Sequence, residues 1–269
     1  MEYKTKHMHA NSSCSYCAIS YMVQAFDIDV MDVDIAKEIN LHLMFEKNNG
    51  QYNSGFMLQN KKWFDLFLNP KGLELVETKL DKKSIIGFLE ENKNVMLGLK
   101  TSQGKHAVVL TEYKNDRFKF FNPRHEGSCD EEYIVLTEDK LADLLDDRIS
   151  IARIILCENK SVDLKDGLIK SLSALESYNR DLKSFIESNA NRKAYRDNLD
   201  LFRPLLLDGL TIMEVVNESN LASLMKQSQK QLLSFIRGTE DALNQKSFLI
   251  AVNEIIAYWE NMIKNALKM

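Results

Sequence analysis

The chain has 269 residues, of which 45% are hydrophobic, so it is long enough to bury one large core or two smaller ones. Its formal net charge of -4 and pI of about 5.8 exclude the strongly basic surface that a nucleic-acid partner would need. The first residues are charged and polar and no apolar run approaches a membrane span, so we expect a cytoplasmic protein without membrane contact.

In chain order, apolar spacing predicts a helix from Cys14 to Phe26, preceded by capping residues at Asn11 to Ser13, and a second helix around Met31 to Met44. Branched and aromatic runs separated by turn residues then predict strands. These strands cover Leu73 to Thr78, Val95 to Lys100, His106 to Tyr113, Phe118 to Phe121, Tyr133 to Leu136 and Ile149 to Leu156. Helical segments are expected between the first two strands and after Thr137. An early helix followed by a mostly antiparallel sheet indicates an α+β fold.

The composition changes near residue 160, because glycine and proline become rare and helix-favouring residues dominate. The predicted helices are Val162 to Ser188, Asn198 to Leu206, Thr211 to Arg237 with a break allowed inside it, and Thr239 to Leu267. Such helices can pack as an antiparallel, all-α bundle. We therefore predict two domains, residues 1–160 and residues 161–269.

The four cysteines lack the spacing of a disulfide framework, so we expect free thiols. Cys14 and Cys17 form a CxxC pair, which in other settings indicates redox or zinc chemistry. The sequence around them has neither the βαβ pattern of a redox motif nor a second pair of zinc ligands. We expect no metal and no cofactor held by the chain, and we interpret Cys17 as a core residue.

Three residues have the chemistry of a thiol catalyst. Cys14 begins the first predicted helix, where unpaired N–H groups and the helix dipole favour a thiolate. His106 begins a strand, KHAVVLTEY, and Asn122 ends the next one, RFKFFNP, after a hairpin turn. The amide of Asn122 is expected to accept from one ring nitrogen of His106 and leave the other facing Cys14.

The segment SSCSYCAISYMV, followed about ninety residues later by GKHAVVLTEYKNDRFKFFNP, resembles the papain-like C39 peptidase clan. In that clan a cysteine starts the long helix, a histidine begins a strand, and Asp or Asn precedes a proline on the next strand. Cys14, His106 and Asn122 fall on these positions, and the resemblance covers roughly residues 7 to 157. It implies a papain-like fold with a central antiparallel sheet and a Cys-His-Asn triad.

The sequence departs from that clan around the nucleophile. Serines flank Cys14 where the clan has Asp and Gly, and Met8 stands where an oxyanion-stabilising glutamine is expected, six residues before the cysteine. Nearby polar residues that could replace this donor are Asn11, Ser12, His9 and His7. Amide chemistry favours Asn11.

The domain layout, a thiol-enzyme domain joined to a helical domain, resembles that of amide-forming acyltransferases of thiotemplated antibiotic assembly, of the closthioamide and butirosin kind. The resemblance implies transfer of an acyl chain, such as an oligo-β-alanyl chain, from the phosphopantetheine thioester of a carrier protein to Cys14. The acyl chain would then pass to a small amine or diamine. A cytoplasmic cysteine peptidase that hydrolyses a peptide or isopeptide bond is the alternative, and a binding module without catalysis is the third reading. The helical domain is also compatible with a homodimer interface.

Overall fold

The computed structural model describes residues 3–102, 104–188, 190–239 and 243–269. The chain forms two compact units, one built from residues 1–39 and 59–162 and the other from residues 40–58 and 163–269. This division differs from the single cut predicted at residue 160, because the chain leaves the first unit at residue 40 and returns to it at residue 59.

The first unit contains a six-stranded sheet in the order β4-β10-β5-β6-β7-β9, in which every neighbouring pair is antiparallel. The strands are β4 (Leu73–Asp81), β5 (Val95–Thr101), β6 (Gly104–Lys114), β7 (Arg117–Phe121), β9 (Tyr133–Thr137) and β10 (Arg148–Leu156). Asn115 and Asp116 join β6 to β7 with positive φ angles of 51° and 56°, as a two-residue hairpin turn of the I′ kind requires. An antiparallel sheet was expected from the sequence, and the structure contains one.

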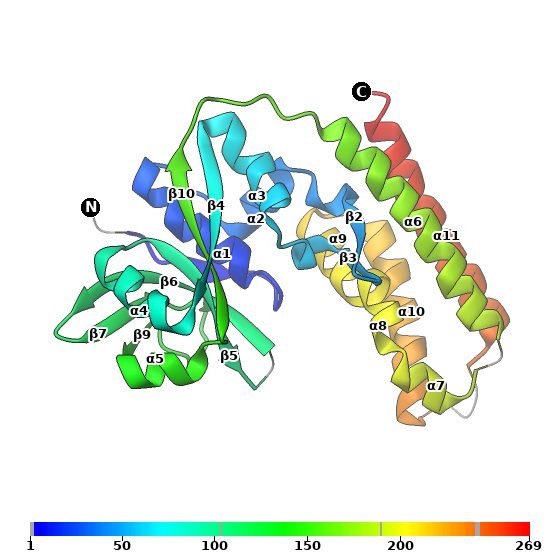
Figure 1. Ribbon diagram of the computed structural model, residues 1–269. Helices are drawn as coiled ribbons and strands as arrows, with labels where there is room; N and C mark the ends of the chain where they lie inside the picture. The colour runs from blue at the N-terminus through cyan, green and yellow to red at the C-terminus, as the bar shows by residue number, and fades with distance from the viewer. Residues whose placement is uncertain (1–2, 103, 189, 240–242) are drawn as a thin grey trace. The chain divides into compact units, whose positions relative to one another are not determined.

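One face of this sheet carries the apolar core. Alternate residues of β5, namely Val95, Leu97 and Leu99, are buried in it together with residues of the helices α4 (Lys82–Glu91) and α5 (Glu138–Leu144). The helix α1 (Cys14–Met22) packs against β6, as Figure 1 shows. Its Tyr21 ring stacks on Phe121 of β7 with centroids 4.0 Å apart. The last turn of α1 is thereby held against the sheet.

Shorter elements complete the first unit. These are β1 (His7–Met8), which pairs in parallel with β8 (Arg124–His125), and the helices α2 (Asp32–Glu38) and α3 (Lys61–Leu68). The helix predicted over Met31 to Met44 is wrong in its length. Asn40 has a left-handed φ of 53° and ends that segment, and a 3₁₀ turn, Leu41–Leu43, follows.

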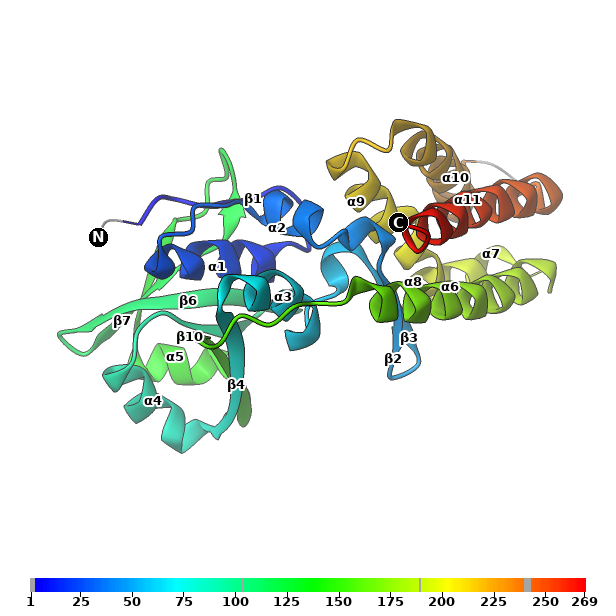
Figure 2. The ribbon, with the colours of Figure 1, turned by 90° about the horizontal axis from the view of Figure 1, so that it is seen from above.

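The second unit is mainly helical. Its helices are α6 (Leu164–Glu187), α7 (Arg192–Asp197), α8 (Leu199–Arg203), a π-helical segment (Pro204–Gly209), α9 (Leu210–Val215), α10 (Ser219–Arg237) and α11 (Gln245–Ala266). Figure 2 shows α6 and α11 side by side. The predicted helix Thr211 to Arg237 is broken where Asn217 takes a φ of 64°, and part of the predicted start of the last helix lies outside the described residues.

A hairpin from the early part of the chain belongs to this helical unit. It consists of β2 (Phe45–Asn48) and β3 (Gln51–Ser54), which the sequence did not predict. The Phe45 ring packs between Tyr178 and Trp259, with centroids at 5.2 and 5.6 Å, and the Trp259 Nε1–H donates to the carbonyl of His42 at 2.8 Å. These buried aromatic contacts explain why residues 40–58 leave the first unit. Among the described residues, no helix has the length and apolar character needed to cross a bilayer.

Candidate active site

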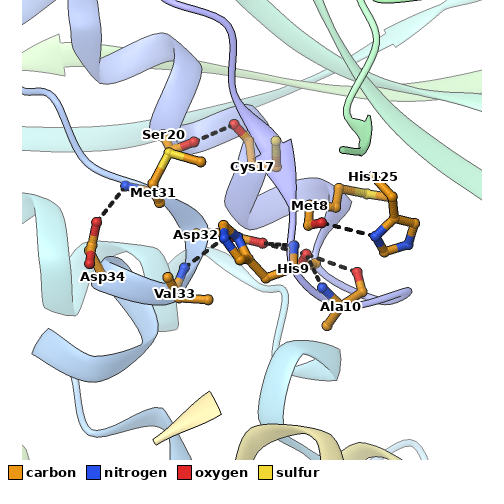
Figure 3. Close-up of polar contacts among 11 residues, drawn as sticks. Met8, His9, Ala10, Cys17, Ser20, Met31, Asp32, Val33, Asp34 and His125 are labelled. Atoms are coloured by element: carbon orange, nitrogen blue, oxygen red, sulfur yellow. Dashed lines mark hydrogen bonds and ion pairs between the residues drawn. The ribbon is translucent and has the colours of Figure 1, made fainter. Parts of the chain in front are cut away.

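The loop before α1 is held in place by one buried carboxylate. Asp32, at the start of α2, has no exposed surface and accepts from the His9 N–H at 2.9 Å and from the Ser13 hydroxyl at 2.6 Å. Its Oδ1 also accepts from the backbone N–H of Val33 at 2.8 Å and lies 2.5 Å from Nδ1 of His9. Figure 3 shows the contacts of Asp32 with His9 and Val33. This network fixes the residue immediately before Cys14, so the first turn of α1 starts from a rigid loop.

Cys14 is the first residue of α1 and is partly buried. Its thiol interacts with His106, the third residue of β6, and with the backbone N–H of Ala107. Burial is the largest single influence and opposes ionisation. The hydrogen bonds from His106 and Ala107 and the positive charge of His106 together outweigh it, so the pKa of Cys14 lies below its ordinary value.

The pKa of His106 is shifted in the opposite direction to that of Cys14. Burial, the largest influence, lowers its pKa, but the hydrogen bond and charge of Cys14, with the hydrogen bond to Asn122, raise the pKa of His106 above the ordinary value. The two opposite shifts describe one coupled pair in which the thiolate and the imidazolium stabilise each other.

Asn122 fixes the orientation of the imidazole. Its Nδ2 donates to the Glu131 carbonyl at 2.8 Å, and its backbone N–H donates to the Glu132 carbonyl at 2.8 Å. The amide oxygen is therefore the atom that faces Nε2 of His106, at 2.9 Å. Nε2 carries the donated hydrogen, which leaves Nδ1 for Cys14. The structure thus brings Cys14, His106 and Asn122 together in the order that a nucleophile, a base and its orienting group require.

A cavity of about 300 Å³ opens beside the thiol, at the lower end of the range for small-molecule sites. The described residues that line it are Cys14, Ser15, Gln59, Glu77, Met96, Leu97, Gly98, Lys105, Ala107, Asp146 and Arg148 to Ala152. Side chains of both charge signs line it, Glu77 and Asp146 on one hand and Lys105 and Arg148 on the other.

Asn11, the expected oxyanion donor, lies elsewhere. Its amide oxygen is 2.8 Å from Nε2 of His125, whose Nδ1 is 2.9 Å from the Met8 carbonyl. The residue is exposed and is not among the described residues that line the cavity. Gln59, which sequence reasoning missed, does line it. No local motif marks Gln59, which reaches Ser15 across 44 positions of the chain.

Cys17 has a different environment from Cys14. It is fully buried in the middle of α1, and burial, the largest influence, raises the pKa of its thiol, with the negative charge of Asp32 adding to the effect. A thiol held protonated in the core is a poor nucleophile. Among the described residues, no group of three or more His, Cys, Asp or Glu side chains has the arrangement of a metal site.

Comparisons with known proteins add little to this geometry. No family model and no curated protein matches the sequence. Among solved structures, the chain is similar to the peptidase domain of Streptococcus ComA, which is described as a bi-functional ABC transporter involved in a quorum-sensing pathway. The likeness has 9% sequence identity and a TM-score of 0.40, and it covers 58% of this chain and 99% of that domain. The chemistry of the site therefore rests on the contacts around Cys14.

Proposed function

We propose that the chain is a cysteine-dependent acyltransferase that forms amide bonds through a thioester on Cys14. The observation that carries the proposal is the linked set of contacts from Cys14 to His106 and from His106 to Asn122, at the start of a helix and at the edge of a cavity. This set supplies a nucleophile whose pKa is lowered, a group that exchanges its proton and an amide that holds that group in one tautomer.

In the first half of the reaction the Cys14 thiolate attacks the carbonyl carbon of an acyl thioester. A new C–S bond forms, the carbonyl electrons move to oxygen, and collapse of this intermediate breaks the bond to the donor sulfur. His106 gives its proton to the departing thiolate. Exchange of one thioester for another changes the free energy little, so the step needs no separate activation of the acyl group.

In the second half an amine attacks the acyl–Cys14 thioester. His106, now neutral, takes the amine proton, and the Cys14 thiolate leaves as the amide forms. The exposed carboxylate of Glu77 on the cavity wall is suited to hold the second ammonium of a diamine. Asp146, the other acidic residue there, already pairs with Lys105 at 2.5 Å.

The resemblance to amide-forming enzymes of antibiotic assembly supports the choice of partners. We propose the phosphopantetheine arm of an acyl or peptidyl carrier protein as donor, an acyl or oligo-β-alanyl chain as cargo, and a small amine or diamine as acceptor. The four free cysteines suit a reducing compartment, so we place the reaction in the cytoplasm.

The experiment is intact-protein mass spectrometry after mixing the chain with acyl carrier-protein thioesters, with and without a diamine. Wild type is compared with Cys14→Ala and with Cys17→Ala, which removes a thiol of the same helix. We expect an acyl mass increment on wild type and Cys17→Ala only, and the diamine should discharge it as an amide.

Two other outcomes assign different functions. An increment that water discharges as fast as the diamine makes the protein a hydrolase, and a peptide-cleavage screen follows. The absence of any increment across the donors, with Cys14→Ala indistinguishable from wild type, makes it a binding module.

A further inference from the structure

The cavity beside the nucleophile has charged side chains at two ends, and the register of the strands fixes their separation. Ala152 of β10 lies opposite Glu77 of β4 on one side and opposite Met96 of β5 on the other. Arg148 comes four residues before Ala152, and Lys100 comes four residues after Met96. Because β5 and β10 are antiparallel, both steps lead toward the same end of the sheet. That end is about 13 Å from the row of Glu77 along the strands.

The nucleophile lies between these two ends. The thiol of Cys14 contacts the backbone N–H of Ala107. Ala107 lies opposite Gly98 of β5, which is midway between Met96 and Lys100. The contact is therefore about 7 Å from each end along the strands.

The carboxylates nearest to the end with Arg148 already have other partners. Asp146 pairs with Lys100 at 3.2 Å and with Lys105 at 2.5 Å. Asp81, which lies opposite Arg148 in the β4–β10 ladder, accepts from the first N–H groups of α4 at 3.1 and 2.8 Å. Three cations stand at this end, and one of them is left over.

Within the described part of the chain, Arg148 is the cation at this end without a carboxylate in ion-pair distance. Its side chain is exposed and lines the cavity. A guanidinium stays ionised and can bind two oxygens of a carboxylate or phosphate at once. We propose that Arg148 binds an anionic group of the acyl donor, either a carboxylate on the acyl chain or the phosphate of the pantetheine arm. The inference rests on the proposed function and names the chemistry that selects its donor.

The other end of the cavity suits the opposite charge. Glu77 is exposed and, among the described residues, has no cation within ion-pair distance. An anionic group is repelled there and an ammonium group is attracted. The two ends therefore direct donor and acceptor to opposite sides of Cys14.

Two alkylating reagents of nearly equal size test the charge at the thiol without any acyl transfer. Iodoacetate carries a carboxylate where iodoacetamide carries a neutral amide, and the thiolate displaces iodide from both. Peptide mapping gives the ratio of the two rates at Cys14 for wild type, Arg148→Gln, Arg148→Glu and Glu77→Gln. Arg117→Gln is the matched control, since Arg117 is an exposed arginine of β7 and is not among the described residues that line the cavity.

We expect the ratio of iodoacetate to iodoacetamide rates to fall roughly three- to tenfold in Arg148→Gln, as the loss of one charge about 7 Å away in a solvated cavity should give. It should fall further in Arg148→Glu. It should rise in Glu77→Gln, because a repelling charge is removed, and Arg117→Gln should match wild type. High salt should reduce the difference between wild type and Arg148→Gln.

Three thioesters then identify the anionic group. Pentanoyl-pantetheine is the neutral reference. Glutaryl-pantetheine adds a carboxylate to an acyl chain of the same length, and pentanoyl-phosphopantetheine adds the phosphate. We expect at least one anionic donor to acylate Cys14 faster than the reference, and Arg148→Gln to lose that preference. The donor that shows the preference identifies the source.

Three results would overturn the site. The first is an unchanged ratio of alkylation rates in Arg148→Gln. The second is an equal change in Arg117→Gln, which would trace the effect to the net charge of the surface. The third is a changed alkylation ratio without any preference among the thioesters, which would mean that Arg148 binds no group of the donor. If no thioester acylates wild type while the alkylation ratio still depends on Arg148, the proposed function fails and the anion site stands for another ligand.

Discussion

Two cysteines of the same helix, three positions apart, have opposite chemical environments. Cys14 opens α1, faces a cavity and contacts His106, and its pKa is lowered. Cys17 lies on the buried side of the same helix, and its pKa is raised. Burial disfavours the charged form of both thiols, so the difference arises from what each thiol can contact.

The comparison teaches that the CxxC spacing by itself has no chemical meaning here. The histidine partner comes from a strand about ninety residues later in the sequence, and the loop that positions Cys14 is held by Asp32. The two thiols therefore depend on different parts of the fold, and mutations can separate them.

The largest expected effect is the difference in reactivity between the two thiols. Iodoacetamide at neutral pH should alkylate Cys14 at least about a thousandfold faster than Cys17, because Cys14 is partly exposed with a lowered pKa whereas Cys17 is buried with a raised pKa. Peptide mapping of timed, quenched samples measures both rates. Comparable labelling of the two thiols would contradict the environments described.

His106→Ala should remove most of that difference. The hydrogen bond and positive charge that favour the Cys14 thiolate are lost while burial remains, so the pKa of Cys14 should rise above the ordinary thiol value. We expect alkylation near neutral pH to fall about a hundredfold, with the pH midpoint moving upward. The alkylation rate, measured against pH for wild type and His106→Ala, gives the midpoint for each protein. An unchanged midpoint would show that His106 does not affect the pKa of Cys14.

Asp32→Ala tests the loop that carries Cys14. It leaves the donors of His9, Ser13 and Val33 without their common acceptor, which should cost about 2 kcal/mol of unfolding free energy. Asp34→Ala is the matched control on α2, since Asp34 is exposed and accepts only from the Met31 N–H at 2.9 Å among the bonds described. Urea unfolding compares the two variants. Equal losses of unfolding free energy in the two variants would mean that the contacts of Asp32 with the loop before α1 add no stability.

Asn122→Ala should have the smallest effect. His106 keeps its contact with Cys14 but loses the amide that fixes its tautomer, so we expect acylation to slow about tenfold. The rate of adduct formation on Cys14 measures this loss. A variant with wild-type rate would mean that the backbone around β6 alone orients the ring.

Much of the first unit could be predicted from local sequence. The strands of the sheet were found within a few residues, because β-branched runs alternate with turn residues such as Asn115 and Asp116. That Cys14, His106 and Asn122 come together could be predicted because their residue types, order and spacing can be read from the sequence.

What was missed depends on contacts between distant segments. The hairpin of β2 and β3 has polar, weakly alternating strands, and it is stabilised by the aromatic packing of Phe45 against the helical unit. Gln59 stands just before α3 with no motif around it, and its contacts with Ser12 and Ser15 join segments that are far apart in the sequence. Asn11 had suitable amide chemistry, but the pairing of β1 with β8 places it beside His125.

The central claim is that His106 holds Cys14 as a thiolate, and the ultraviolet absorbance of the thiolate tests it most directly. The difference spectrum between wild type and Cys14→Ala, recorded against pH, isolates this thiol from the other three cysteines. We predict a transition below the pH at which ordinary thiols ionise, and its displacement to higher pH in His106→Ala. A wild-type transition at the ordinary thiol pKa, unchanged in His106→Ala, would contradict the account.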